Sequence, residues 1–448
     1  MRRVGALLAA VVLALLCAPP AGAVEPPVID PAALPPDEVG PDQPMEQRHE
    51  CRAPTVFPDS NFADRPWASD YLKLAEARKF ATGAGVTVAV IDTGINASPR
   101  VPAEPGGDFV DPPANGMSDC DAHGTLVASI IAGRPAPTDA FVGVAPDARI
   151  LSLRQTSDFF QFVGARPNPN DPNTTQTAGS LRSLARAVVH AANLGAQVIN
   201  ISEAACYKVT RPINETGLGA AINYAVNVKG AVVVVAAGNT GEDCTQNPPP
   251  DPAVPTDPRG WGEVKTIVSP AWYSPLVLTV AAIGQNGQPL PSSMSGPWVG
   301  VAAPGADLVA LGYDGNPVNA MRGDDGLIPV AGTSYATAFV SGLAALLKQR
   351  FPELTPAQII NRITATARHP GGGVDNYVGA GVIDPVAALT WDVPPGPEKA
   401  EYKVKEIPPP VFVPPPDRGP ITIVVVIGAS LAFVLGVGIL ARRALRRR

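Results

Sequence analysis

Hydrophobic positions in the central part of the chain alternate between short continuous runs and runs with helical spacing. Continuous apolar runs predict strands that are buried on both faces, and they lie at Val86–Asp92, Ala148–Arg154, Gln197–Ser202, Ala231–Asn239 and Val277–Ile283. Helical spacing predicts helices that begin near His123 or cover Ser180–Gly195, Gly219–Val228, Ser334–Phe351 and Thr355–Arg368. Strands that alternate with helices indicate an α/β fold, with a mostly parallel sheet and helices on both faces.

Two long segments interrupt this alternation. Gly164–Gly179 is rich in Asn and Pro, and Thr240–Pro275 contains the run PPPDPAVPTDP. Loops of this length are usually functional or mobile. Both follow predicted strands, and sheets of this kind place their sites at the carboxyl ends of strands. We therefore expect both loops to lie near a functional site.

An apolar segment near the start of the chain predicts export. Residues 1–23 begin with Arg2 and Arg3, continue as the apolar run Val4–Leu16 and end in Ala21-Gly22-Ala23. This is the pattern of a cleaved secretory signal peptide, because the apolar run is too short to span a membrane comfortably. An uncleaved anchor is the alternative.

A second apolar segment near the end of the chain predicts a membrane anchor. Ile421–Ala441 carries no charge and is long enough to span the ~30 Å hydrocarbon core, whereas a buried core helix is the alternative. Residues 442–448 are rich in arginine, and positive charge stays in the cytoplasm. We therefore expect a single-pass protein of the cell membrane, with everything before Ile421 on the extracytoplasmic side.

Composition divides the remaining chain and excludes several classes of protein. A hydrophobic content of 46% excludes disorder throughout, and a net charge of −6 argues against a nucleic-acid-binding protein. Proline clusters mark the expected boundaries: a Pro-rich extension at 24–81, a folded domain at 82–391, a Pro-rich linker at 392–420, the membrane helix at 421–441 and a basic tail at 442–448.

Four residues at the ends of predicted elements could carry chemistry. Asp92 closes a strand, while His123 and Ser334 each open a helix. Taken singly, such residues are usually turn residues or helix caps. Together they match a serine-hydrolase triad, in which Ser334 attacks a carbonyl, His123 transfers its proton and Asp92 orients the imidazole. Asn239 follows another strand and could donate to the oxyanion, together with the Ser334 backbone N–H.

The motifs around these residues resemble the subtilisin-like (S8) serine proteases. They read DTG at Asp92, HGT at His123, AAGN ending at Asn239 and GTSYA at Ser334, in the subtilisin order. DTG also occurs in aspartic proteases, but their mechanism needs a second carboxylate, and the chain has no second DTG or DSG.

With its extension, tether and final helix, the whole chain resembles the mycosins, which are membrane-anchored proteases of mycobacterial type VII secretion systems. That resemblance implies a serine endopeptidase that cleaves exported protein substrates through an acyl-enzyme, with membrane components of a type VII secretion complex as partners. A scaffold that stabilises the secretion complex, with proteolysis secondary, is the alternative function.

Three features depart from the subtilisin pattern. Ser202, Glu203 and Ala204 stand where subtilisins commonly carry Ser-Leu-Gly, an edge that pairs with the substrate backbone. We assign these three residues to substrate binding without carrying over a substrate preference. Tyr335 replaces the usual Met after the nucleophile. Residues 24–81 lack the α/β pattern of an inhibitory pro-domain, so we expect a retained extension that wraps the domain.

The cysteines predict two disulfide bonds. Cys17 lies in the signal peptide, and four cysteines remain, an even number that suits an oxidising compartment. Cys206 and Cys244 each follow one of two strands that a βαβ unit joins, and such strands are often neighbours. We therefore predict Cys206–Cys244 and, by remainder, Cys51–Cys120, although four cysteines allow three connectivities.

The remaining polar candidates receive plain interpretations. His190 lies in an apolar helix and is expected to pack there, while His49 and His369 lack metal-ligand spacing. The acidic pairs Asp324-Asp325 and Asp119/Asp121 lack the ligand spacing of a calcium loop and are expected in solvated loops. We expect no metal and no cofactor.

Overall fold

The protein is described here by a computed structural model. The structure describes residues 24–164, 177–211, 213–241, 244–323, 326–405 and 419–446. The predicted signal peptide, most of the loop Gly164–Gly179 and the pair Asp324-Asp325 lie outside these residues. The chain divides into two units, Met1–Lys405 and Glu406–Arg448, which we describe separately.

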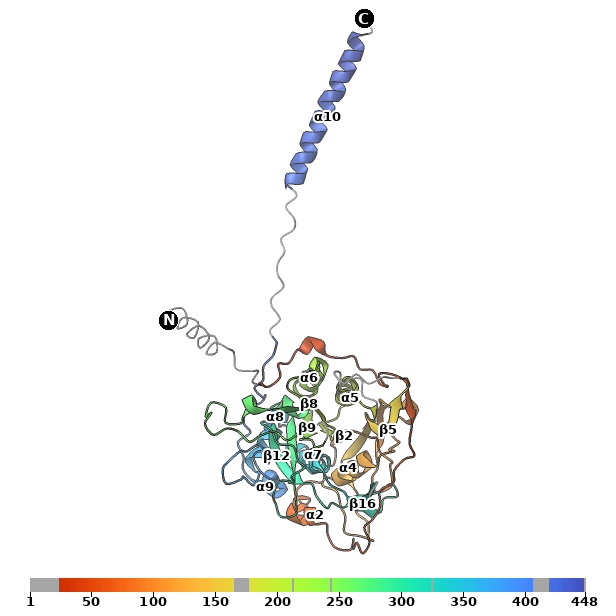
Figure 1. The fold of residues 1–448 in the computed structure, drawn as a ribbon, viewed down its shortest axis with the longest axis vertical. Coiled ribbons are helices and arrows are strands. Elements are labelled where there is room, and N and C mark those ends of the chain that lie inside the picture. Colours follow the sequence, from red (N-terminus) through yellow and green to blue (C-terminus); the bar gives the residue numbers. More distant parts are fainter. Residues whose placement is uncertain are drawn as a thin grey trace, which may run out of the picture. The chain divides into compact units, whose positions relative to one another are not determined.

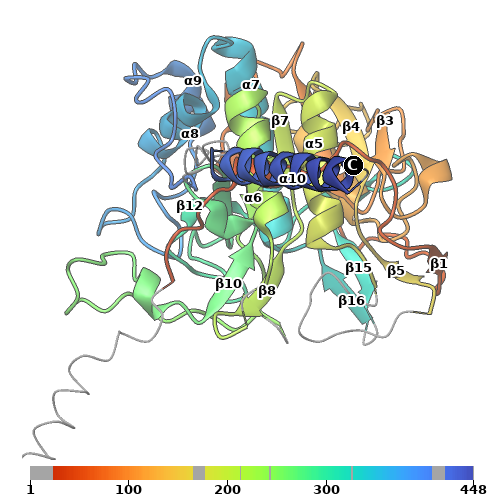
Figure 2. The same ribbon diagram turned by 90° about the horizontal axis from the view of Figure 1, so that it is seen from above.

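A seven-stranded parallel sheet forms the centre of the first unit (Figure 1). Its strands follow the order β12-β11-β9-β7-β2-β4-β3, and Figure 2 shows β12 and β3 at opposite ends. Their bounds are β2 Thr87–Asp92, β3 Glu104–Asp108, β4 Arg149–Arg154, β7 Val198–Ile201, β9 Val232–Ala236, β11 Leu278–Ile283 and β12 Val299–Pro304. Every residue of β2, β7, β9 and β11 is buried, which explains their continuous apolar sequences.

Helices cover both faces of this sheet, which confirms the predicted fold class. On one face α4 packs against α7, and on the other α5 packs against α6 (Figure 1). In α7 all residues from Thr333 to Leu347 are buried, so it forms the central helix of the core. The bounds are α4 His123–Ala132, α5 Leu181–Asn193, α6 Thr216–Asn223, α7 Thr333–Arg350, α8 Pro356–Ala365 and α9 Pro385–Thr390. Ser180 and Thr355 cap α5 and α8 through capping boxes.

Several strands have no clear signal in the sequence. β3 has the sequence EPGGD, and Gly, Pro and Asp are depleted in strands. The segment Thr240–Pro275 is more ordered than its loop-like sequence suggests, because it contains β10 Thr266–Ser269, which pairs with β8 Ala205–Lys208. Other short strands are β1 Met45–Gln47, β5 Ser157–Phe162, β6 Thr177–Ala178, β13 Ala310–Leu311, β14 Pro317–Val318, β15 Ala320–Gly323 and β16 Gly326–Pro329.

The Pro-rich extension is part of the first folded unit. Ile29 is buried, the short 3-10 helix Pro31–Ala33 packs on α6, and β1 pairs with β5. Further along, α2 Trp67–Tyr71 buries Ala68, and α3 Leu74–Ala77 buries Leu74 and Ala77. Figure 1 shows this red-to-orange segment following the rim of the unit.

Carboxylates of the extension bind side chains of α5. Asp37 accepts from Asn193 and lies 2.7 Å from Nδ1 of His190, while Asp42 lies 2.7 Å from an Arg186 nitrogen. The prediction that His190 is simply a packing residue is therefore wrong. Its partner is about 150 positions away in the chain, so the helical pattern around His190 carried no sign of it.

Residues 392–405, the first part of the predicted linker, also lie on the first unit. The backbone of Ile29 exchanges hydrogen bonds with Lys403 and Lys405, and the Tyr402 hydroxyl donates to Asn223. The start of the extension and the end of the first unit therefore lie side by side.

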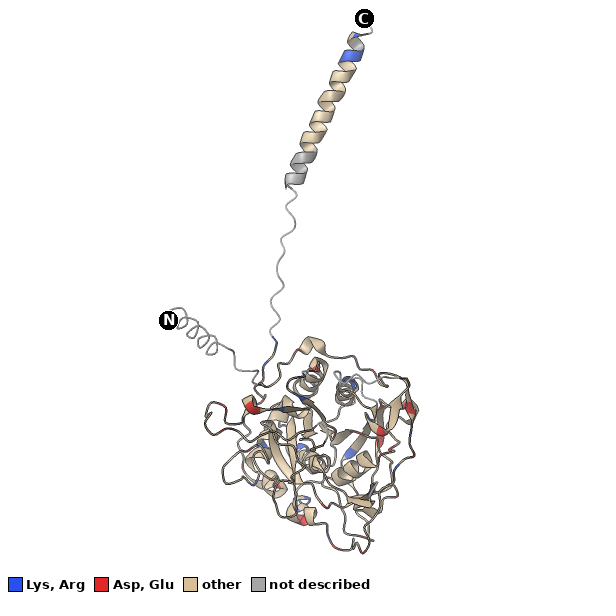
Figure 3. Ribbon diagram, viewed as in Figure 1, with Lys and Arg blue, Asp and Glu red and all other residues tan. Residues whose placement is uncertain are grey.

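The second unit contains the helix α10, Gly419–Leu445. Its stretch Val426–Arg443 is the one helical segment, among the described residues, that is long and apolar enough to cross a membrane. Figure 3 shows that its charged residues gather at the C-terminal end, where Arg442 and Arg443 lie.

Candidate active site

Adjacent strands and two helix N-termini bring the predicted site residues to one edge of the sheet. Asp92 ends β2, Ser202 follows β7 and Asn239 follows β9, and these three strands are neighbours. Because the strands are parallel, their carboxyl ends meet at the same edge. His123 is the first residue of α4, and Ser334 is the second of α7. A cavity of about 370 Å³ at this edge is lined by His123, Ser334, Asn239 and the segment Ser202–Ala204.

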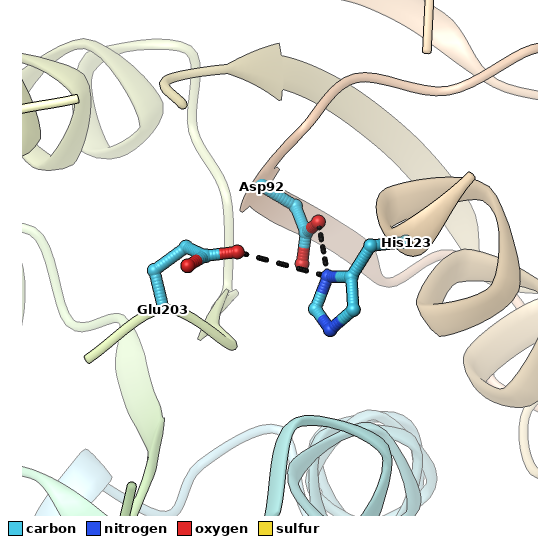
Figure 4. A group of neighbouring side chains, drawn as sticks. All are labelled: Asp92, His123 and Glu203. Carbon is cyan, nitrogen blue, oxygen red and sulfur yellow. Dashed lines mark hydrogen bonds and ion pairs between the residues drawn. The ribbon is translucent and has the colours of Figure 1, made fainter. Parts of the chain in front are cut away.

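Asp92 and His123 form a direct hydrogen bond. Nδ1 of His123 lies 2.7 Å from Oδ1 of Asp92, which is fully buried (Figure 4). The backbone N–H of Thr93 also donates to that oxygen, at 2.7 Å. The close approach requires glycine at position 124, because a Cβ there would lie 2.2 Å from the carbonyl oxygen of Gly94. This explains the small residue in the HGT motif.

The buried carboxylate of Asp119 supports the Asp92–His123 pair. Asp119 was expected in a solvated loop, but it is 2% exposed and accepts four hydrogen bonds. Its donors are the Thr93 hydroxyl, the Asp121 N–H, and both the N–H and the hydroxyl of Thr125. Asp119 therefore links the loop after Asp92 to the first turn of α4. Burial raises the pKa of Asp119 to about 7, although the Thr125 hydrogen bonds oppose the shift.

Asn239 is oriented by its amide oxygen. That oxygen accepts from the Thr333 N–H at 3.0 Å and from the Thr333 hydroxyl at 3.3 Å. The opposite end of the amide, the NH₂ group, is then available to donate. The backbone N–H of Ser334 lies in the first turn of α7, where helix N–H groups have no partner within the helix. Both residues line the same cavity.

A chain of hydrogen bonds that the sequence did not reveal ties β7 to α7. The Ser341 hydroxyl donates to Asn200, the Asn200 amide donates to the Ser202 hydroxyl, and Ser202 donates to the carbonyl of Ser334. All four residues are buried. These hydrogen bonds fix the segment after β7 relative to Ser334. The one sign of them in the sequence was a polar residue, Asn200, within the apolar strand QVINIS.

Tyr335 fills the space beside the imidazole. Its ring centroid lies 5.2 Å from that of His123, and the residue is buried. The residue after Ser334 therefore packs against His123 on the side of α7.

Glu203 brings a second carboxylate to His123. Its Oε1 atom lies 3.7 Å from Nδ1 of His123, and Figure 4 shows the carboxylates of Glu203 and Asp92 directed at the same edge of the ring. Burial opposes protonation of His123, but Asp92 and then Glu203 outweigh it and raise the pKa of His123 to about 10. Burial raises the pKa of Glu203 to about 7, although the charge of His123 lowers it.

Asp92, His123 and Glu203 are also residue types that bind metal ions. A tetrahedral zinc ion with ~2.0 Å bonds would separate two ligand atoms by about 3.3 Å. The 2.7 Å between His123 and Asp92 is shorter and matches a charge-assisted hydrogen bond. Proton sharing therefore explains this pair better than a metal ion.

Both disulfide bonds lie close to this site. Cys51 pairs with Cys120, and Cys206 pairs with Cys244, as predicted from the sequence. The first bond joins the extension to the loop just before His123. The second joins the segment after Ala204 to the loop after Asn239.

Comparison with known proteins places the chain in a family. Residues 83–381 match the Subtilase family, peptidase S8. Mycosin-1 of Mycolicibacterium smegmatis is 77% identical over 448 residues, which cover all of both chains. The crystal structure of MycP1 from the ESX-1 type VII secretion system is 79% identical, with a TM-score of 0.84, over 85% of this chain and all of that one. A chain in a structure of an intact ESX-5 inner membrane complex is 47% identical, with a TM-score of 0.80, over 94% of this chain and all of that one.

The chain belongs to the subtilase family of serine proteases and, within that family, to the mycosins. The resemblance inferred from the sequence motifs is therefore confirmed. A subtilisin-like serine protease is the enzyme class that fold and family define.

Proposed function

We propose that the protein is a serine endopeptidase whose triad is Asp92, His123 and Ser334. The observation that carries this proposal is the 2.7 Å hydrogen bond between Asp92 and His123 at a cavity that Ser334 and Asn239 also line. Among the described residues the Ser334 hydroxyl makes no hydrogen bond with His123. In proteases without substrate this contact is often long, and it tightens when substrate binds.

Each residue has one step in this reaction. The Ser334 hydroxyl attacks the peptide carbonyl while His123 takes its proton, and Asp92 holds Nδ1–H so that Nε2 faces the serine. The Asn239 amide and the Ser334 N–H stabilise the negative oxygen of the tetrahedral intermediate. His123 then protonates the leaving amine, and water hydrolyses the acyl-enzyme.

We further propose that the active site faces the extracytoplasmic side, where the membrane helix α10 holds the protein within a type VII secretion complex. An apolar helix that ends in Arg442 and Arg443 supports this orientation. A relative from the ESX-1 secretion system and another within an ESX-5 inner membrane complex support this choice of partner. Exported proteins are then the substrates within reach.

Labelling with a fluorophosphonate serine probe tests the enzymatic proposal. The full-length protein in detergent is compared with Ser334→Ala and with His123→Ala, and Ser430→Ala, on the membrane helix α10, is a control for serine content. Labelling of the wild type and of Ser430→Ala alone is the expected result. A folded, disulfide-bonded wild type that stays unlabelled would contradict the proposed triad.

A scaffold role is the second candidate function. The specific observation in its favour is the 47% identical chain found inside an intact ESX-5 inner membrane complex. Ser334→Ala separates the two functions in cells that lack the wild-type gene. If secretion persists with the Ser334→Ala variant but fails when the gene is deleted, the scaffold function is favoured.

A further inference from the structure

We propose that Glu203 is a specificity-determining residue that binds a cationic side chain of the substrate, a lysine or arginine next to the scissile bond. This inference rests on the proposed function, because it assigns a substrate class to the same cavity. Glu203 lines that cavity together with Ser334 and His123.

The Glu203 carboxylate lacks a hydrogen-bond donor. Within the described part of the chain no N–H or O–H group donates to it, and its one close polar neighbour is His123 Nδ1 at 3.7 Å, longer than a hydrogen bond. Its side chain is 35% exposed, so it is half withdrawn from water and yet open to the cavity. In its ionised form this acceptor gains from a donor that a ligand supplies, and a cation beside it favours that form.

A second acceptor beside it is also unsatisfied. Oδ2 of Asp92 is buried with no hydrogen-bond partner, and Asp92, His123 and Glu203 bring their ligand atoms within 4.8 Å of one another. Two carboxylates therefore face one imidazole, which carries at most one positive charge. The remaining negative charge attracts a further cation.

The other charges on the cavity wall are already engaged or are also negative. Arg52 is the one Lys or Arg among the lining residues, and its guanidinium lies over the Phe159 ring at 5.4 Å. Asp121 accepts from the Ser157 hydroxyl at 2.6 Å and from the Asp158 N–H at 2.8 Å. Asp158 adds a further exposed carboxylate. Of these carboxylates, Glu203 is the one that lies beside His123 without accepting a hydrogen bond.

The backbone that carries Glu203 is fixed at the reacting centre. Its neighbour Ser202 bonds to the carbonyl of Ser334 at 3.1 Å and to the buried Asn200 amide at 2.9 Å. This segment lines the same cavity as Ser334. A cation on a substrate in that cavity can then approach the carboxylate without rearrangement of the protein.

Binding of the cation also affects the catalytic base. The charge of Glu203 helps to raise the pKa of His123, which holds the imidazole in its protonated form. An ammonium or guanidinium group next to Glu203 offsets that charge and favours the neutral imidazole that the reaction needs. A basic substrate is thus favoured both in binding and in the first proton transfer.

Peptide aldehydes that compete with fluorophosphonate labelling of the full-length protein in detergent test the inference. Each probe is an alanine tetrapeptide aldehyde with lysine at one position, compared with norleucine and with ε-acetyl-lysine at that position. At one position we expect lysine to compete at a roughly tenfold lower concentration than either neutral residue. Glu203→Gln should abolish the difference, and Glu38→Gln, an exposed glutamate on the extension, should keep it.

Every outcome bears on the inference. Equal competition by charged and neutral probes at all positions would overturn it while leaving the proposed function intact, as would a lysine preference that survives in Glu203→Gln. If Glu203→Gln does not fold, Glu203→Leu, which restores the residue common in subtilisins, takes its place. Absence of labelling in the wild type would instead remove the proposed function and this inference with it.

Discussion

Glu203 Oε1 lies 3.7 Å from His123 Nδ1, at the ring edge already bonded to Asp92. Two carboxylates therefore stabilise the protonated imidazole at one nitrogen. Because only the neutral imidazole can accept the serine proton, this arrangement sets the pH range in which the protein can act.

Replacement of Glu203 by Gln should shift the acid limb of activity to lower pH. The acid limb of the pH–activity curve reports loss of the proton from His123. Asp92 and Glu203 help to raise the pKa of His123 to about 10. Removal of one negative charge at this distance should lower that pKa by about one unit. The measurement is the rate of fluorophosphonate labelling between pH 6 and pH 10, with Glu38→Gln as the matched control. Identical limbs in all three proteins would contradict the prediction.

Replacement of Asn239 by Ala should slow acylation by about 10²–10³-fold, the loss seen when a subtilisin loses one oxyanion donor. Asn239→Asp is a sharper variant, because its carboxylate can still accept from the Thr333 N–H but cannot donate to an oxyanion. Both variants should be labelled slowly while their unfolding temperatures stay near that of the wild type. A fully active Asn239→Asp protein would show that the oxyanion is bound elsewhere.

The folded protein should become more stable as the pH falls from about 7 to 5. Burial raises the pKa of Glu215 to about 7, although hydrogen bonds from Ser269 and Tyr207 oppose the shift. Between its ordinary value of 4.5 and about 7 the folded state holds a proton that the unfolded state has lost. Stability therefore falls as the pH rises through this window, by about 1.4 kcal/mol per pH unit for one proton.

Thermal unfolding at several pH values tests this prediction. Asp119 and Glu203 are raised in the same direction, so Tm should increase steadily on acidification to pH 5. Glu215→Gln should reduce the dependence of Tm on pH by the contribution of one proton, and Glu38→Gln should leave that dependence unchanged. A Tm that rises toward pH 8 would be inconsistent with buried carboxyls that take up protons on folding.

Removal of the Cys51–Cys120 bond should destabilise the protein by about 2–4 kcal/mol. The bond connects segments 69 positions apart and joins the extension to the loop that leads to His123. The double variant Cys51→Ser, Cys120→Ser should melt at lower temperature and be labelled more slowly, because Cys120 adjoins Asp119. Calorimetry and labelling on the same preparation check both effects, and an unchanged Tm would mean that the extension does not contribute to folding through this bond.

Local sequence was sufficient wherever an element supplied its own pattern. The buried strands β2, β7 and β9 appear as continuous apolar runs, and α7 as a long apolar helix, so the fold class was predictable. β3 was not, because EPGGD becomes a strand only through its pairing with β4. Asp119 was misjudged for a similar reason, since three of its four hydrogen bonds come from Thr93 and Thr125 on the elements that enclose it.

By itself the sequence determined the class of chemistry and the positions of Asp92, His123, Asn239 and Ser334 at the ends of elements. It could do so because strand ends and helix starts follow from hydrophobic runs and small motifs that are local in the chain. Only the tertiary structure decided that Glu203 faces His123 and that Asp37 binds His190. Those contacts join residues 80 and 153 positions apart, and such distant residues meet only when separate elements pack on one sheet.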